Sequence, residues 1–142
     1  MRQTIWAAVL FSAGLVAGNL LQPVGILRAQ GSQRVFELRT YTAPEGKLGA
    51  LNTRFRDHTR RIFDKHGMTS IGYWVPQDAP DSQNTLIYII AHKSREAAKQ
   101  SWADFQADPE WKKVSEESQR DGRIVSKVVS VFMDPTDYSG IR

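Results

Sequence analysis

The amino-acid sequence predicts a single α+β domain whose elements follow the order strand, helix, strand, strand, helix, strand. Three observations lead to this prediction. Four short stretches are rich in β-branched and aromatic residues, two longer stretches repeat apolar residues every three or four positions, and turn-forming residues separate these stretches. With 142 residues, 41% of them hydrophobic and 24% charged, the chain is long enough for one such domain and too short for two ordinary ones.

The first part of the domain supplies a strand and a long helix. Residues 34–42 alternate between apolar and polar side chains and stop before Pro44, which is typical of a strand. From Gly46 the apolar spacing changes to three and four, which indicates a helix that ends near Gly67. The side chains that share one face of this helix are Leu48, Leu51, Phe55, His58 and Ile62.

Two further strands follow this helix. Residues 68–75 and residues 85–92 are rich in β-branched and aromatic side chains, which favour strands. The segment between them, 76–84, is dense in proline, aspartate, serine and asparagine, which are typical of turns. We therefore expect two strands joined by a loop.

A helical region and a last strand complete the domain. Ser94 is a good N-cap for a second helix, because a serine hydroxyl can accept a hydrogen bond from the first turn. Asp108 followed by Pro109 begins a short further helix, which should run to Gly122. Residues 124–133 return to a β-branched pattern and are predicted to form the last strand.

This order of elements suits a four-stranded antiparallel sheet with helices on one face, the ferredoxin-like βαββαβ arrangement. The other face of the sheet would then carry large apolar groups from several strands without a cover. Such a patch is normally buried against a partner. The sequence therefore predicts a homodimer that forms sheet to sheet.

Residues 1–29 have the pattern of an export signal. Arg2 precedes an apolar run without a charged side chain through Leu21, and Ala29 offers a small residue for cleavage. The alternative is an uncleaved membrane anchor formed by residues 5–21, whose length is at the low end of what a bilayer-spanning helix needs. Both interpretations place the domain, residues 34–142, outside the cytoplasm, in the periplasm or in the medium.

Composition excludes several functions. Cysteine is absent, which excludes disulfides, thiolate metal sites and a cysteine nucleophile. Two of the 19 basic residues lie in residues 1–29, which we call the leader, so the domain has 17 basic and 15 acidic residues. This surplus of positive charge is too small to indicate a nucleic-acid partner. The sequence contains no nucleophile elbow, P-loop or dinucleotide fingerprint, and no histidine spacing typical of a metal site.

Several phrases, in this order, resemble the NIPSNAP family. They are Glu-Leu-Arg-Thr-Tyr at 37–41, His-Gly-Met at 66–68, Ile-Gly-Tyr-Trp at 71–74, Ala-His-Lys-Ser-Arg-Glu-Ala-Ala at 91–98, Asp-Pro-Glu-Trp at 108–111 and Pro-Thr-Asp-Tyr at 135–138. The resemblance covers essentially everything after the leader and implies a dimeric α/β barrel. It implies no settled reaction, because the wider superfamily includes cofactor-free monooxygenases, haem-degrading or haem-binding proteins, isomerases and members without known activity. Whether this protein is an enzyme stays open.

His58 is the first candidate for chemistry. It lies on the apolar face of the predicted first helix, where a polar ring that faces the sheet needs a partner or a ligand. It is either a core histidine bonded within the protein or a group for proton transfer or ligand anchoring. His66 stands eight residues further on, about 12 Å along a helix axis, so the two rings are not expected to chelate one metal ion.

A ligand pocket is predicted between the sheet and the helices or between subunits. Arg39 and Tyr41 share one face of the first strand with Glu37, and they join His58 as candidate catalytic residues. The candidate pocket residues are Tyr73, Trp74, His92 and Trp102. Apolar walls with a few polar groups suit a small organic ligand, and the tryptophans also suit a flat aromatic molecule or haem, although no cofactor is predicted.

The alternative interpretation of these residues is an ion pair between Arg39 and Glu37 with ordinary aromatic packing around it. The protein would then be a noncatalytic extracytoplasmic interaction or structural protein. A basic run on the first helix is expected to form a solvated face, with pairs such as Asp57 and Arg61, and anion or lipid binding is the other possibility for it. The run consists of Arg54, Arg56, Arg60, Arg61 and Lys65.

Overall fold

The computed structural model describes residues 34–142, which contain the whole predicted domain. The predicted export signal, residues 1–29, lies outside the described residues, so both its cleavage and its role as an anchor stay predictions. Within the described range, no helix is both long enough and apolar enough to cross a bilayer.

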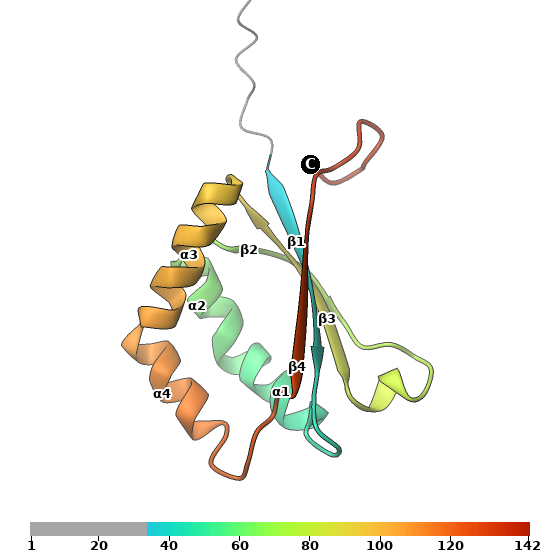
Figure 1. Ribbon diagram of the computed structural model, residues 1–142, viewed down its shortest axis with the longest axis vertical. Helices are drawn as coiled ribbons and strands as arrows, with labels where there is room; N and C mark the ends of the chain where they lie inside the picture. Colours follow the sequence, from blue (N-terminus) through green and yellow to red (C-terminus); the bar gives the residue numbers. More distant parts are fainter. Residues whose placement is uncertain (1–33) are drawn as a thin grey trace, which may run out of the picture.

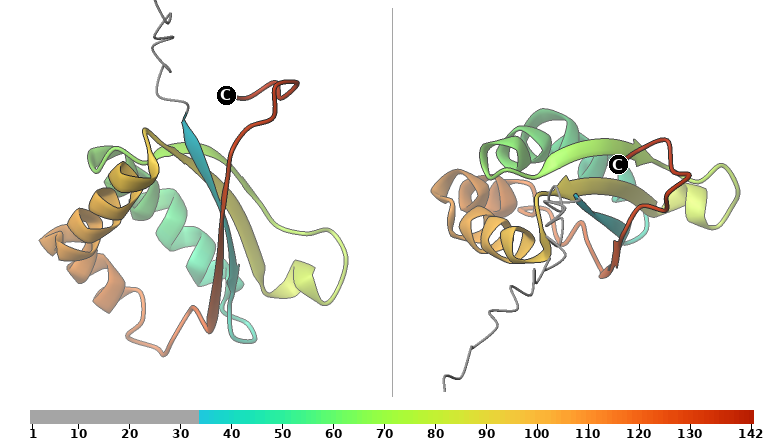
Figure 2. Two further views of the ribbon diagram at one scale, coloured as in Figure 1. Left: turned by 45° about the horizontal axis from the view of Figure 1, so that its top comes forward. Right: turned by 90° about the horizontal axis from the view of Figure 1, so that it is seen from above.

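Four strands form one antiparallel sheet. They are β1 (Val35–Thr42), β2 (Thr69–Trp74), β3 (Thr85–His92) and β4 (Lys127–Met133). Their order across the sheet is β2-β3-β1-β4, so the first and third strands are central and the other two are edges. The helices that follow β1 and β3 cover the same face of the sheet (Figures 1 and 2). The predicted ferredoxin-like arrangement is confirmed.

Three consecutive helical segments occupy the predicted first helix. They are α1 (Leu48–Arg54), the π-helical segment η1 (Phe55–Thr59) and α2 (Arg60–Lys65). In η1 the hydroxyl of Thr59 donates a hydrogen bond to the carbonyl oxygen of Arg54, five residues earlier, at 3.2 Å. A π-helical turn contains more residues than an α-helical one, so it changes which side chains face the sheet. The helical region ends at Gly67, whose φ of 73° favours glycine.

The second helical region consists of α3 (Arg95–Ala107) and α4 (Pro109–Glu117). Ser94 caps α3, because its hydroxyl accepts a hydrogen bond from a backbone N–H of the first turn at 3.0 Å. Asp108 caps α4 in the same way, accepting from the backbone N–H of Glu110 at 2.8 Å. Both helix starts agree with the prediction from sequence.

The end of α4 and the start of β4 differ from the prediction. The helix stops at Glu117 and not at Gly122, and the strand begins at Lys127 and not at 124. Ile124 explains the difference, because its side chain is almost completely buried in the core. This apolar residue anchors the connection to the core and does not extend the strand.

The core between the sheet and the helices is rich in aromatic rings. Phe55 lies 5.0 Å from Tyr88, and Phe63 lies 5.0 Å from Phe105, measured between ring centroids. Apolar side chains from all layers surround these rings, namely Leu51, Ile62, Met68, Leu86, Ile90 and Ile124. Burial of these aromatic and aliphatic side chains is the dominant favourable contribution to folding, since the chain has no disulfides.

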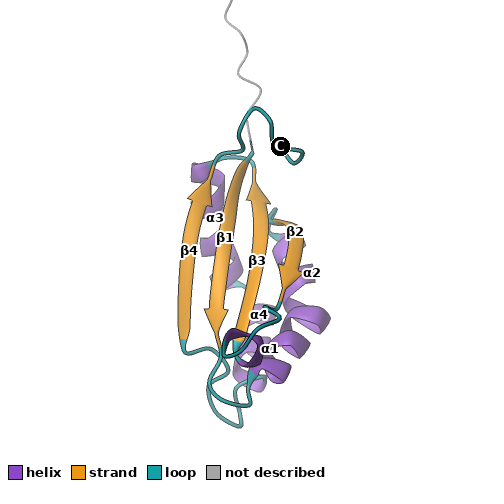
Figure 3. Ribbon diagram, turned by 90° about the vertical axis from the view of Figure 1, so that its right-hand side faces the viewer, coloured by secondary structure: helices purple, strands orange, loops and turns teal. Residues whose placement is uncertain are grey.

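The opposite face of the sheet, drawn toward the viewer in Figure 3, carries no helix in the described part of the chain. By strand alternation, Phe36 and Met133 lie at the end of this face that the C-terminal residues Pro135 and Ile141 border. The large apolar side chains on the rest of its paired positions are Leu38, Trp74, Ile87, Ile89, Val129 and Val131. Trp74 is 50% exposed, although it is the largest of them. We call these six residues the outer sheet face.

Candidate functional site

Glu37 is the centre of a buried polar cluster on the helix-facing side of the sheet. Its Oε1 accepts hydrogen bonds from the Arg39 guanidinium and from the Ser130 hydroxyl, both at 2.6 Å. Its Oε2 accepts one from the Trp102 indole N–H at 2.7 Å and lies 3.0 Å from Nε2 of His92. We call these five residues the Glu37 cluster.

Strand register and one helix bring the Glu37 cluster together. Glu37 and Arg39 stand two residues apart on β1 and therefore point to the same face. Ser130 of β4 is paired directly with Arg39, and His92 ends β3 on the other side of β1. Trp102 reaches the carboxylate from α3, so the cluster joins three strands to one helix.

The carboxyl group of Glu37 is held in its charged form. Burial acts to raise its pKa, but hydrogen bonds from His92, Ser130, Trp102 and Arg39 outweigh burial and lower the pKa to about 2. Only 1% of this residue is exposed. Glu37 is thus a weak proton acceptor, and its arrangement suits the holding of its neighbours.

Arg39 and Trp102 form a stacked pair. The guanidinium carbon of Arg39 lies 4.2 Å from the indole ring centroid, a favourable cation–π distance. A second guanidinium nitrogen lies 3.4 Å from the Tyr41 hydroxyl. Burial acts to lower the pKa of Arg39, but the nearby Tyr41, Tyr88 and Glu37 side chains raise it, so the guanidinium stays charged.

A hollow of about 520 Å³ lies beside this stacked pair. We call it the α3–β4 hollow, and its lining residues are Arg95, Glu96, Lys99, Trp102 and Phe132. The guanidinium carbon of Arg95 lies only 3.5 Å from the ring centroid of Phe132. Two aromatic rings, two cations and one carboxylate therefore surround a space that suits a flat organic molecule with a negative group.

Four of the predicted site residues lie together. Arg39, His92 and Trp102 belong to the Glu37 cluster, and Tyr41 contacts its edge. His92 has no exposed side-chain surface, so it is a structural member of the cluster. The ion pair between Arg39 and Glu37, which the alternative interpretation of the sequence predicted, is present at 2.6 Å.

Tyr73 and Trp74 do not join this cluster. Tyr73 faces the helices, but its ring stacks on Tyr88 at 5.4 Å within the aromatic core, and its hydroxyl pairs with Ser70 at 2.8 Å. Trp74, the next residue on the strand, points to the outer sheet face. The expectation that Trp74 shares a pocket with Trp102 is wrong, because neighbouring strand residues face opposite sides of the sheet.

His58 does not face the sheet, so its predicted position on the buried face is wrong. The side chain is exposed, and Thr59 takes the inward position with 1% exposure. The cause is η1, whose wider turn rotates the helix surface between Phe55 and Ile62. His58 instead borders a separate hollow between α1 and α4.

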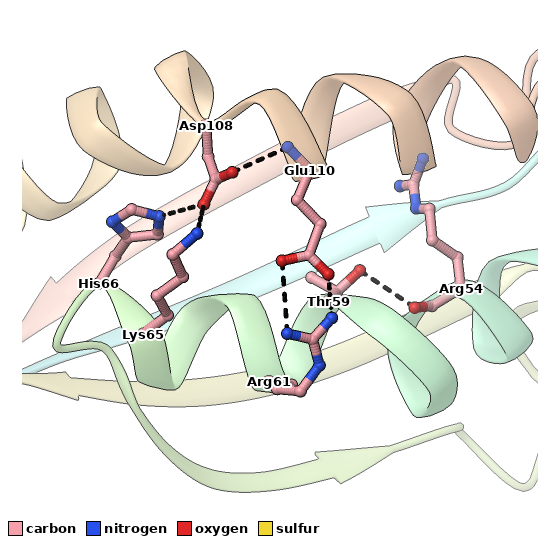
Figure 4. Close-up of polar contacts among 7 residues, drawn as sticks. All are labelled: Arg54, Thr59, Arg61, Lys65, His66, Asp108 and Glu110. Atoms are coloured by element: carbon pink, nitrogen blue, oxygen red, sulfur yellow. Dashed lines mark hydrogen bonds and ion pairs between the residues drawn. The ribbon is translucent and has the colours of Figure 1, made fainter.

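The basic run of the first helical region is also not one solvated face. Arg54 is buried, with 5% exposure. Arg61 pairs with Glu110 of α4, and Lys65 pairs with Asp108 at 2.8 Å (Figure 4). These ion pairs join two helices and replace the predicted pairs within one helix.

Three residues near the cluster were not predicted from sequence. Ser130 is a polar residue in an otherwise apolar strand, on the same face as the predicted pocket, which is the signal that could have identified it. Arg95 and Phe132 give no such signal, because only the approach of α3 to β4 brings them together. Within residues 34–142, no three side chains of metal-binding type lie close enough to hold an ion.

The NIPSNAP family model matches residues 36–140 of the chain. A comparison with curated proteins found no match. A NIPSNAP family protein of unknown function from Agrobacterium tumefaciens has a similar structure, with a TM-score of 0.67, 23% identity, and coverage of 78% of this chain and 96% of that one. An uncharacterized NIPSNAP-like domain protein from Burkholderia xenovorans has a TM-score of 0.66, 17% identity, and coverage of 76% and 90%.

A more distant neighbour is a cofactor-independent oxygenase from Streptomyces nogalater. Its structure has a TM-score of 0.50 and 12% identity, and the comparison covers 76% of this chain and 98% of that one. At such identities, these likenesses show a common fold and leave the chemistry of each protein to its own site residues.

Proposed function

The chain belongs to the NIPSNAP family, and from that premise we propose that it is a homodimeric, exported protein that binds a small, flat organic molecule in the α3–β4 hollow. One observation supports this most strongly. A single buried carboxylate, Glu37, fixes the Trp102 ring through its indole N–H and fixes the Arg39 guanidinium stacked on it. A wall that is rigid before the ligand arrives loses little conformational entropy on binding.

The ligand class follows from the lining of the hollow. The rings of Trp102 and Phe132 offer flat apolar surfaces, which suit an aromatic or conjugated molecule. Arg95 and Lys99 outnumber the single carboxylate of Glu96, so a ligand with one negative group is favoured over a neutral or cationic one. We therefore propose a planar organic anion as the ligand.

Catalysis is not part of this proposal. Oxygenation without a cofactor, the activity named for the Streptomyces neighbour, generally needs a group that takes a proton from the substrate. Glu37, with its pKa lowered to about 2, is a poor base, and His92 is fully buried. The Nε2 atom of His92 is held by Glu37 and the ring has no exposed surface, so this histidine is not accessible to a haem iron.

Ligand binding is tested by calorimetric titration of 2-naphthoate into the purified protein. Native mass spectrometry of the protein as isolated is a separate test, which looks for a ligand that the protein retains. We expect saturable binding, with an affinity at least tenfold weaker in Lys99→Ala, because this substitution removes one of two cations from the hollow. Lys113→Ala is the matched control, since Lys113 is an exposed lysine of α4 outside the hollow. Equal affinities in the two variants would contradict the proposed site.

The homodimer is proposed from the outer sheet face. A second copy would bury the exposed apolar side chains of this face, of which Trp74, Val129 and Val131 are 50%, 43% and 48% exposed. The six residues of the face carry no charge, so two copies of it can pack on each other. Two adjacent valines of β4 allow a direct test. Val128 and Val129 are 42% and 43% exposed, but Val128 points toward the helices and Val129 points to the outer sheet face.

We expect Val129→Asp to yield a monomer by light scattering, and Val128→Asp to keep the mass of a dimer. The two substitutions add the same charge at equal exposure, so a difference between them reports the face and not the charge. A monomeric mass for the wild-type protein would exclude the dimer.

If pull-down from envelope extracts found a stable protein partner while no small molecule bound, the noncatalytic interaction protein would be the better description.

Export is proposed from residues 1–29 alone. Fractionation of cells that express the full chain, followed by N-terminal sequencing, tests it. We expect an extracytoplasmic protein whose mature chain begins near Gln30. A full-length protein in the membrane fraction would favour the anchor formed by residues 5–21, and a cytoplasmic protein would exclude both.

A further inference from the structure

Arg54, the last residue of α1, is a buried cation without a counter-charge. Only 5% of it is exposed, and within residues 34–142 it forms no ion pair. Its one side-chain hydrogen bond, to the Ser118 hydroxyl of α4, is long at 3.5 Å. Its Nε has no hydrogen-bond partner, and its guanidinium carbon lies 5.1 Å from the Trp111 ring centroid.

The comparison with Arg39 shows how unusual this arrangement is. Both guanidinium groups lie between the sheet and the helices, but Arg39 has the carboxylate of Glu37 at 2.6 Å. Burial lowers the pKa of Arg54, while the nearby Tyr41 and Tyr88 oppose that effect. A buried charge that lacks a partner is strongly unfavourable, so an anion bound beside Arg54 would supply the counter-charge that the described residues do not.

A hollow of about 330 Å³ lies where such an anion would bind. It opens between α1, η1 and α4, and its lining residues are Ala50, Thr53, Arg54, His58, Val114, Glu117 and Ser118. Figure 4 shows the Arg54 side chain extending from the first helical region toward α4. The polar groups on the wall include a guanidinium, an imidazole and two hydroxyls, all of which can donate hydrogen bonds to an anion.

The π-helical segment contributes directly to this hollow. Because η1 places Thr59 against the core, His58 moves to the side of the helix that borders the hollow. π-helical turns are rare, and those that occur are frequently found at functional sites. The same distortion that removes His58 from the sheet therefore places it near Arg54.

One lining residue opposes an anion. Glu117 carries a negative charge, but its side chain is 46% exposed and lies 3.8 Å from the guanidinium of Arg120. Water and this neighbouring cation screen its charge far more than the buried charge of Arg54 is screened. The buried part of the hollow is therefore positive.

We propose that this hollow is a second binding site, in which the Arg54 guanidinium, assisted by the Ser118 hydroxyl and the His58 ring, binds a small oxyanion. A guanidinium can bind two oxygens of a carboxylate or phosphate side by side, and these charge-assisted hydrogen bonds are the strongest that an arginine forms. The site is separate from the α3–β4 hollow and stands even if the proposed ligand of that hollow is wrong.

The test uses the purified full-length protein and measures thermal unfolding with inorganic phosphate, acetate or glycerol phosphate, against chloride at equal ionic strength. We expect at least one oxyanion to raise the melting temperature, by roughly 10 °C at a hundredfold excess over its Kd. A response to glycerol phosphate that exceeds the response to phosphate would identify an esterified ligand. No response to any oxyanion would overturn the proposal.

Two arginines of the first helical region provide the matched variants. Arg54→Met keeps an unbranched, flexible apolar side chain and removes the guanidinium, so the variant should lose the oxyanion response and should be at least as stable as the wild type in chloride. Arg56→Met, at an exposed arginine two residues away, should keep the response. An unchanged response in Arg54→Met would overturn the proposal.

Two measurements keep the test independent of how Arg54→Met folds. His58→Ala changes an exposed side chain, so the fold should persist while the affinity for the oxyanion falls severalfold. In wild-type protein labelled with nitrogen-15 in arginine, the buried Arg54 Nε–H signal should shift as the oxyanion is added. A stationary Arg54 signal during a positive thermal response would place the anion elsewhere.

Discussion

Two buried carboxylates, Glu37 and Asp108, have similar surroundings and different consequences. Glu37 is bonded by one arginine, one histidine, one tryptophan and one serine. Asp108 is bonded by Lys65 Nζ at 2.8 Å, His66 Nε2 at 2.7 Å and the backbone N–H of Glu110 at 2.8 Å (Figure 4). Each carboxylate therefore satisfies its oxygens within the protein.

The two carboxylates differ in what their hydrogen-bond donors contact besides the carboxylate itself. The donors to Asp108 are the end of α2 and the beginning of α4, so this carboxylate fixes the angle at which two helices meet. The donors to Glu37 include the indole of Trp102, a residue that also lines an open hollow. A buried ionic cluster therefore indicates a binding site only where its members also border empty space.

The largest expected effect is that of Glu37→Ala. This substitution removes the acceptor for four side chains and leaves the Arg39 guanidinium buried without its partner, so we expect a loss of about 3 to 5 kcal/mol in the free energy of unfolding. Urea unfolding followed by circular dichroism measures it. If the loss were below that of Asp108→Ala, the Glu37 cluster would not be the main polar anchor of the fold.

The second-largest expected effect is on the pH dependence of stability, to which both carboxylates contribute. The pKa of Glu37 falls from an ordinary 4.5 to about 2 in the folded state, so it stabilises the fold above pH 4.5, and this contribution is lost as the pH falls toward 2. The pKa of Asp108 is also lowered, first by the hydrogen bond from Lys65 and then by that from His66, so its contribution is lost on acidification as well.

We expect Glu37→Gln to flatten the dependence of stability on pH between about 4.5 and 2. Asp108→Asn should flatten it less, because Lys65 is half exposed and water screens its charge. The measurement is the urea midpoint at a series of acidic pH values. Identical slopes for Glu37→Gln and the wild type would contradict the assigned pKa of Glu37.

Trp102→Phe should separate stability from binding. The ring remains to pack against Phe63 and Phe105, but the indole N–H no longer reaches Glu37, so we expect a loss of about 1 kcal/mol in stability. The affinity for 2-naphthoate should fall more than stability does, because the wall of the hollow is no longer fixed. Trp111→Phe, which also changes a tryptophan that packs on Phe105, is the control and should keep the affinity.

Ser130→Ala should have the smallest effect. Its hydroxyl is one of four donors to Glu37 and lies on an edge strand, where water can replace it, so we expect a loss of about 0.5 kcal/mol. Chemical unfolding at neutral pH measures it. A loss as large as that of Trp102→Phe would mean that the four donors act as one cooperative network.

The sequence was sufficient for the four strands, the two helical regions and the caps at Ser94 and Asp108. These features depend on spacing and on residues a few positions apart, such as the alternation in β1 and the hydroxyl of Ser94 that accepts from its own first turn. The pairing of Glu37 with Arg39 could be predicted for the same reason, since both lie on one face of one strand.

Only the tertiary structure decided which predicted site residues meet. The π-helical turn turned His58 away from the sheet and Thr59 toward it, although both positions fit the apolar spacing. Trp74 and Trp102 were both candidate pocket residues by sequence. The alternation of side chains along β2, however, places Trp74 on the outer sheet face. The meeting of Arg95 with Phe132, and of Arg54 with α4, depends on how helices pack, which residues far apart in the chain determine together.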